Sequence, residues 1–182
     1  MDDSEQYLAA IKGDLPHMPV EVIREWLLPY AQLLEWPPAV GLSHAANRWH
    51  GILSHRPLEF WRKVRWRQET GVLELDDLDD QSRSHLLGIR DSHVLGINNA
   101  YSGIEDGKRR IASILHYVLK HGSIPSAISL LADGARLDVI DGHNRLVVYF
   151  LNRNPKFRNA LPPDAAPFDP TVHKWIGSFS AS

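Results

Sequence analysis

The sequence predicts an α+β fold in which a small mixed sheet is flanked by helices and preceded by an N-terminal helical region. Two short apolar runs, residues 126–131 and 136–140, enclose an Asp133-Gly134 pair that is typical of a β-hairpin turn. Amphipathic helical spacing comes before this hairpin, over 106–120, and after it, over 144–151. The predicted parts are a helical region 1–58, a core 59–152 and an irregular arm 153–182.

The composition is that of a globular protein with a substantial core. The chain has 182 residues, of which 43% are hydrophobic and 23% charged, and its formal net charge is -2. It contains no cysteine, which excludes disulfides, thiolate zinc sites and cysteine nucleophiles. The first residues are acidic rather than basic and then apolar, and no apolar run approaches the ~18 residues of a membrane span. We therefore expect a cytoplasmic protein without a signal peptide.

Tryptophan-rich helical segments are predicted before residue 58. Apolar residues from Val20 to Tyr30 have helical spacing after Pro19, and a further helix is predicted over 42–53 around Trp49. Aromatic residues at this spacing favour a core or a partner-binding surface over a cofactor site.

Residues 60–67 alternate in a way that predicts a strand with a basic face, although a helix continuing from Leu58 fits nearly as well. A solvated face is favoured over nucleic-acid contact there. A short helix is predicted over 76–87, capped by Asp79 or Asp80, followed by a strand or loop over 88–97 and a turn at Asn98-Asn99.

The helix over 106–120 has the most regular apolar stripe and ends before Gly122. Lys108, Arg109 and Arg110 place cations near the positive end of its dipole, which is unfavourable unless an anion binds there. A phosphate-bearing ligand and solvated arginines explain this pattern equally well. The arm after residue 152 has five prolines and one apolar patch, Trp175-Ile176.

The strongest functional signal is Asp141-Gly142-His143-Asn144-Arg145, a polar loop between an apolar strand and a helix. A helix start with a glycine beside it favours anion binding, because the first backbone N–H groups have no partner within the helix. Arg145 adds a planar donor suited to phosphate, and His143 a donor whose charge varies near neutral pH. The structural alternative is that Asp141 or Asn144 only caps the helix.

The ten histidines do not indicate a metal site of their own, because no pair has the spacing that places two ligands on one helical face.

The order of these elements, with Asp141-Gly142-His143-Asn144-Arg145 as its firmest part, resembles the ParB/sulfiredoxin (ParB/Srx-like) superfamily over residues 95–152. The corresponding loop is Gly-Cys-His-Arg in sulfiredoxin-like members and Gly-Glu-Arg-Arg in chromosome-partition members. Gly142 and Arg145 match both patterns, whereas His143 stands where the nucleophilic cysteine or the glutamate stands. Sulfinic-acid reduction is excluded without cysteine, and the helix-turn-helix domain and second Asn-containing phosphate motif of partition proteins are not found.

The resemblance implies a ParB-like core that hydrolyses ATP with Mg²⁺ and also cleaves DNA, as in small stand-alone members that inhibit plasmid conjugation and T-DNA transfer. The catalytic candidates are Asp141, His143 and Arg145, with Asp141 also the candidate metal ligand. The candidate phosphate-binding residues are Gly142, Asn144, Arg145, Arg109 and Arg110. The alternative is a non-catalytic nucleotide- or DNA-binding module that blocks transfer by docking on conjugation, type IV secretion or coupling proteins, with the tryptophan-rich region and the arm as its surface.

Overall fold

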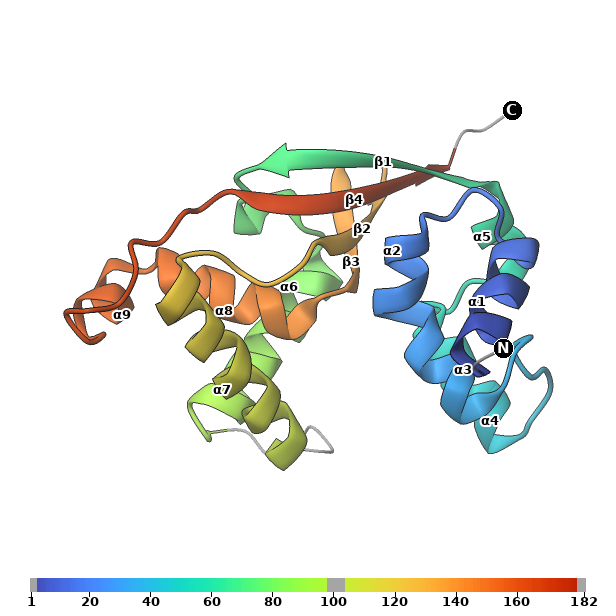
Figure 1. Ribbon diagram of the computed structural model, residues 1–182, viewed down its shortest axis with the longest axis horizontal. Coiled ribbons are helices and arrows are strands. Elements are labelled where there is room, and N and C mark those ends of the chain that lie inside the picture. Colours follow the sequence, from blue (N-terminus) through green and yellow to red (C-terminus); the bar gives the residue numbers. More distant parts are fainter. Residues whose placement is uncertain (1–2, 98–103, 180–182) are drawn as a thin grey trace. The chain divides into compact units, whose positions relative to one another are not determined.

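The computed structural model describes residues 3–97 and 104–179 (Figure 1). The chain divides into two compact units: Met1–Arg67 with Trp175–Ser182, here called the first unit, and Gln68–Lys174, the second unit. The described residues form helices and one four-stranded sheet of order β1-β4-β2-β3. The predicted α+β class is confirmed.

The first unit is mostly helical, as predicted. Its helical segments are α1 (Asp3–Asp14), α2 (Val20–Val22), a π-helical turn η1 (Ile23–Leu27), α3 (Leu28–Leu34), α4 (His44–Ile52) and α5 (Leu58–Lys63). Pro19 precedes α2 as its N-cap, and Ser43 caps α4 by accepting a hydrogen bond from the Ala46 N–H at 3.1 Å. Trp26, Trp49 and Trp61 are buried, so the aromatic residues of this region form its core.

The basic segment 60–67 combines both of its expected structures. Helix α5 continues through Lys63, and strand β1 (Val64–Gly71) begins at the next residue. The strand prediction is therefore wrong for residues 60–63 and confirmed for the rest. Arg65 and Arg67 are exposed, as expected of a solvated face.

The first helical elements of the second unit are a 3-10 turn, η2 (Leu75–Asp77), and helix α6 (Asp80–Ile89). Asp79 is the cap of α6, and its carboxylate accepts from the Ser82 N–H. The strand or loop expected over 88–97 is wrong for residues 88–94, because α6 runs on into a π-helical turn, η3 (Arg90–Val94), and residues 95–97 form the expected loop. The turn predicted at Asn98-Asn99 lies outside the described residues.

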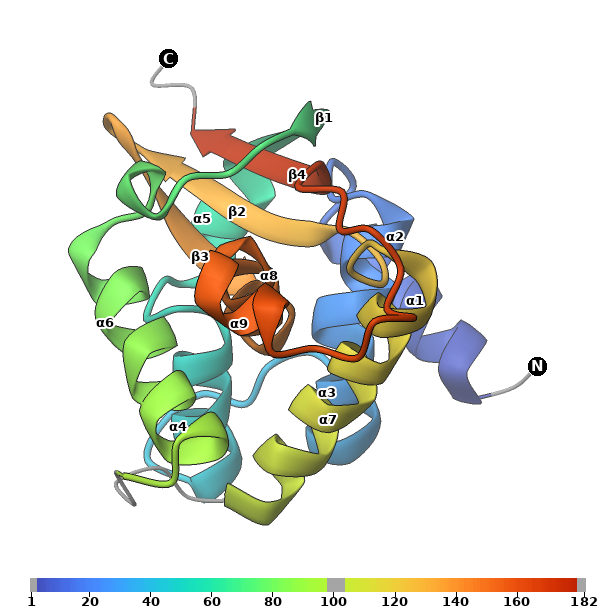
Figure 2. The same ribbon diagram turned by 90° about the vertical axis from the view of Figure 1, so that its left-hand side faces the viewer.

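The β-hairpin and the helices on either side of it are confirmed. Strands β2 (Ile128–Asp133) and β3 (Arg136–Asp141) pair antiparallel, with Leu130 opposite Val139. The helices are α7 (Ile104–His121), α8 (His143–Arg153) and the short α9 (Pro155–Asn159). Helix α8 lies between α6 and α7 and contacts both (Figure 2). Its buried face, including Leu146, Val148 and Tyr149, belongs to the core of the unit.

The segment after residue 152 is not an irregular arm throughout. It contains α9 and strand β4 (Val172–Phe179), which lies between β1 and β2 in the sheet and buries Ile176. Backbone hydrogen bonds to strands distant in sequence stabilise this segment despite its prolines. Separately, none of the described helices has the length and apolar character needed to cross a membrane.

Candidate functional site

Gly142 makes the turn from β3 into α8. Its φ of 99° lies in the left-handed region, which residues with a Cβ rarely adopt. A Cβ at this position would lie 2.7 Å from Cγ2 of Ile128 and 3.3 Å from Nε of Arg145. Glycine is therefore required here both by the backbone conformation and by the lack of space for a Cβ.

Helix α8 begins without a side-chain cap. Its N-cap is Gly142, which has no side chain, so neither Asp141 nor Asn144 is the N-cap that the structural alternative expected. The first hydrogen bond of the helix joins the Leu146 N–H to the Gly142 carbonyl at 2.9 Å. The positive end of the helix dipole lies at this glycine, in an arrangement that favours an anion.

Arg145 is buried, with 9% of its surface exposed, and is held from two sides. Its guanidinium donates hydrogen bonds to the Asp141 carboxylate, four residues earlier, and to the Ser126 hydroxyl. The pair neutralises both charges. Asp141 and Arg145 are thus brought together, as the motif suggested, but they bind each other.

The imidazole of His143 packs against the imidazole of His85, which belongs to α6. The two imidazoles meet edge to face with ring centroids 4.7 Å apart. Burial, with the neighbouring His85 and Arg145 as smaller causes, lowers the pKa of His143 to about 3. Burial also lowers the pKa of the more exposed His85. His143 is therefore neutral near physiological pH, and the expectation that its charge varies there is wrong.

Asn144 carries an unusual buried polar atom. Its Oδ1 is shielded from solvent and has no hydrogen-bond partner among the residues that the structure describes. Such atoms are rare, because a buried acceptor loses its hydrogen bonds to water without replacement. Rotation of the amide by half a turn would exchange the oxygen for the NH₂ group, which can donate to an anion. Asn144 is the second residue of α8, so this amide lies in the first turn of the helix.

The cluster Lys108, Arg109 and Arg110 has a local explanation. Because α7 begins at Ile104, these cations lie in its second turn, beyond the strongest part of the dipole. Lys108 pairs with Glu105 and Arg109 with Asp106, each three residues earlier. Arg109 is 77% exposed at its side chain and Arg110 is also exposed. These pairs remove the need for a bound anion, so the cluster no longer supports a phosphate site.

The metal assignment to Asp141 fits the structure poorly. Its carboxylate binds the Arg145 guanidinium, and a cation placed on it would lie beside that positive charge. Within residues 3–97 and 104–179, no group of three or more histidine, aspartate or glutamate side chains could hold a metal ion. The part of the chain that the structure describes therefore offers no preformed cluster of three or more such ligands for Mg²⁺.

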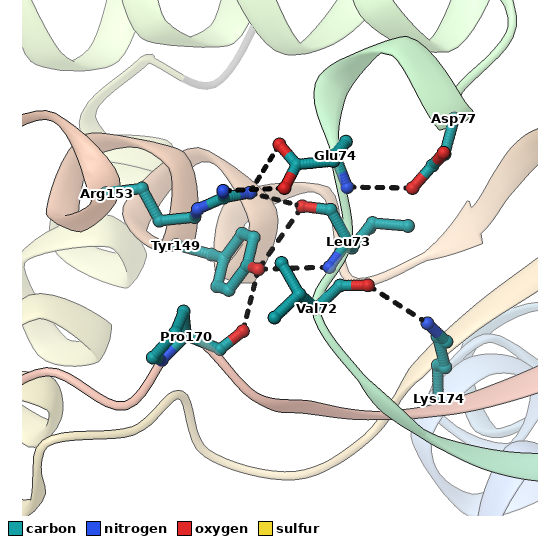
Figure 3. A network of polar contacts seen from close by, with 8 residues as sticks. All are labelled: Val72, Leu73, Glu74, Asp77, Tyr149, Arg153, Pro170 and Lys174. Carbon is teal, nitrogen blue, oxygen red and sulfur yellow. Dashed lines mark hydrogen bonds and ion pairs between the residues drawn. The ribbon is translucent and has the colours of Figure 1, made fainter.

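The far end of α8 is anchored by a polar network (Figure 3). Arg153 binds both carboxylate oxygens of Glu74, at 2.7 and 2.9 Å, and the Leu73 carbonyl at 2.7 Å. The hydroxyl of buried Tyr149 accepts from the Leu73 N–H at 3.1 Å and donates to the Pro170 carbonyl at 2.8 Å. These contacts fix the direction of the helix and hence the position of its start.

Sequence reasoning missed His85 and Ser126, which reach the loop from α6 and from the segment before β2. Neither residue has a local signal, because only the fold brings it to Asp141-Arg145. Comparison of the chain with protein-family models, with curated proteins and with solved structures found no match. The ParB/sulfiredoxin resemblance therefore rests on the motif residues and the order of elements alone.

Proposed function

We propose that the second unit binds the phosphate groups of a nucleotide at the start of α8. One observation carries the proposal: at an uncapped helix start, the side-chain oxygen of Asn144 is shielded from solvent and has no partner among the described residues. Unpaired N–H groups and the helix dipole favour phosphate, and the amide can present its NH₂ group to the same ligand. The family resemblance favours ATP.

The residues of the loop divide into binding and positioning groups. The backbone N–H groups of His143 and Asn144 contact the phosphate oxygens, and the left-handed turn at Gly142 places them at the start of the helix. Arg145 is a positioning residue: paired with Asp141 and Ser126, it fixes the loop rather than supplying a net charge. This differs from the role that the sequence suggested for Arg145.

The resemblance implies hydrolysis of ATP, and we include this activity in the proposal. His85 is the proposed general base. A water oxygen attacks the γ-phosphorus, the bond to the β–γ bridging oxygen breaks, and ADP leaves with that electron pair. The water proton passes to a ring nitrogen of His85, which is neutral, more exposed than His143 and next to the loop. DNA cleavage would use the same attack on a phosphodiester.

The test is calorimetric titration of the full chain with ATP, CTP and a short DNA duplex, each with and without Mg²⁺. Asn144→Asp keeps the side-chain shape but places a negative charge in the first turn, so we expect at least ten-fold weaker ATP binding. The matched control is Asn159→Asp, an exposed position in α9. Equal ATP affinity in both variants would contradict the proposed site.

The non-catalytic alternative is favoured by a different observation. Arg145 and Asp141 are paired, and the pKa of His143 of about 3 makes it a weak base, which argues against a catalytic role for these three residues. In this case the unit binds nucleotide or DNA without turnover, and docking on secretion or coupling proteins blocks transfer. Loss of ATP hydrolysis in His85→Gln but not in the exposed control His116→Gln supports the enzyme. ATP binding without hydrolysis by the purified unmodified chain supports the binding module.

Inhibition of conjugation is the cellular role that the resemblance favours. We expect donor cells that express the chain to transfer a conjugative plasmid less often than cells with an empty vector. Loss of this effect in Asn144→Asp would connect the role to the α8 site.

A further inference from the structure

The loop between α3 and α4, residues 35–43, presents an apolar tip to solvent (Figure 1). Val40 is 92% exposed and Leu42 is 97% exposed, and Leu33 in the last turn of α3 is 72% exposed. Residues 36–43 contain no charged side chain. Large apolar side chains that gather in one short segment and remain in water are typical of a surface that another molecule covers.

The base of this loop is fixed, so its tip is held in one position. The Trp36 indole N–H donates to the Asp14 carboxylate at 2.9 Å. The Trp36 ring also meets the Trp49 ring of α4 edge to face, with centroids 5.4 Å apart. Ser43 caps α4 at the other end of the loop. A surface that is already ordered loses little conformational entropy when it binds, which favours a specific partner.

A cavity of about 510 Å³ lies beside the tip, within the first unit. Most of its lining residues are apolar, and they come from residues 38–41 of the loop, from α4 and from the start of α5. The two charged residues of the lining, Arg56 and Glu59, have opposite signs, so the lining has no net charge. Val40 belongs to the lining, whereas Leu42 projects beside it. One surface therefore has both a projecting apolar side chain and a hollow that can receive one.

Two side chains of opposite charge lie at the edge of this surface. Glu35 precedes Trp36 in the chain, and Arg48 precedes Trp49. Because the two tryptophan rings are in contact, both charged residues belong to the same part of the unit. Both are exposed, and neither side chain has a hydrogen bond or an ion pair within the part of the chain that the structure describes. An acid and a base are therefore both available to a partner that carries the same two charges.

We propose that this surface binds a second copy of the chain about a two-fold axis, with Leu42 of each copy in the cavity of the other. A two-fold interface uses the same patch on both copies, so each copy must supply both the projecting side chain and the hollow, as this surface does. At the rim, Arg48 of one copy pairs with Glu35 of the other. A lining without net charge favours this partner over nucleic acid or an anionic membrane, since both attract excess positive charge. The inference is independent of the nucleotide site in the second unit.

The test is sedimentation velocity of the full chain over a concentration range of about 1–200 μM, which covers moderate and weak self-association. We expect the mass to rise with concentration from the 20.6 kDa of one chain to twice that value. Leu42→Ser should raise the dissociation constant of the dimer at least about ten-fold, because serine gains little from burial in an apolar cavity. The matched control is Leu87→Ser, at an exposed leucine of α6 in the second unit, which should leave the constant unchanged.

Exchange of the two rim charges tests how the copies face each other. Arg48→Glu should weaken the dimer, because two glutamates then meet across the rim, and adding Glu35→Arg should restore it. A monomer at every concentration, a dimer that Leu42→Ser leaves intact, or a double exchange that does not restore the dimer would each overturn the proposal. Binding of a monomer to phosphatidylglycerol vesicles that Leu42→Ser abolishes would overturn it in favour of a lipid surface.

Discussion

The Arg145 guanidinium is paired with the Asp141 carboxylate, and Gly142, the N-cap of α8, lies between the two residues in the sequence. This pair closes the polar loop on itself and, with Ser126, fixes the first turn of the helix. The sequence predicts that Arg145 binds phosphate directly. In the structure it instead holds in place the backbone that we propose binds phosphate.

Double-mutant measurements test this pairing. Arg145→Met and Asp141→Ala should each destabilise the fold, by about 2–4 kcal/mol for the arginine variant, because each leaves a poorly solvated charge without its partner. The double variant should lose less than the sum of the two, with a coupling energy of about 1–3 kcal/mol. Urea unfolding of the four proteins measures this. Strictly additive losses would show that the pair has no energetic role.

Gly142→Ala should cost more stability than Gly134→Ala. Both glycines have positive φ, but a Cβ at 142 meets Ile128 at 2.7 Å, whereas nothing lies within 4 Å of a Cβ at 134. We expect a loss of about 1 kcal/mol at Gly134, from the backbone conformation, and about 2–4 kcal/mol at Gly142. Chemical denaturation of the two variants gives the comparison, and equal losses would argue against tight packing at the loop.

His143 should make stability depend on pH in the acidic range. Its pKa is about 3 in the folded protein and near 6.5 when unfolded, so between these values only the unfolded chain takes up the proton. The free energy of unfolding therefore falls as pH drops below 6.5, by at most about 1.4 kcal/mol per pH unit for this group.

His143→Gln should flatten that dependence, whereas the exposed control His116→Gln should not. Urea unfolding at pH values from 7 to 4 measures both slopes. A His143→Gln protein with the same slope as the unmodified chain would show that the imidazole is not held neutral.

Tyr149→Phe tests the anchor at the far end of α8. The substitution removes the hydroxyl that accepts from Leu73 and donates to Pro170, and it leaves a buried backbone N–H without its partner. We expect a loss of about 1–3 kcal/mol in the free energy of unfolding. Tyr117→Phe, at a more exposed ring, should change it little. A matching small change at Tyr149 would mean that the anchor does not hold the helix.

Local patterns were enough to predict the elements nearest the candidate site. Each of these elements depends on residues that are close together in the sequence, so a local pattern reveals it. They are the apolar stripe of α7, the hairpin around Gly134 and the glycine before α8. Strand β4 was missed because its stability comes from β1 and β2, which are distant in the chain.

The candidate site was predictable only in part, for the same reason. The turn at Gly142 is a local property, whereas the partners that decide the chemistry of Arg145 and His143 are Ser126 and His85 from other elements. A sequence pattern shows which groups are present but not which of them neutralise one another. Ser126 and His85 therefore alter the roles that the motif alone indicates for Arg145 and His143.

The most direct test of the central claim is to follow the backbone amide resonances of the α8 loop by ¹H–¹⁵N NMR while ATP is added. We expect large, saturable shifts of the His143 and Asn144 amides, and weak or absent shifts at Arg109 and Arg110. Binding of ATP that leaves the His143 and Asn144 amides unchanged, or no binding at millimolar ATP, would contradict it.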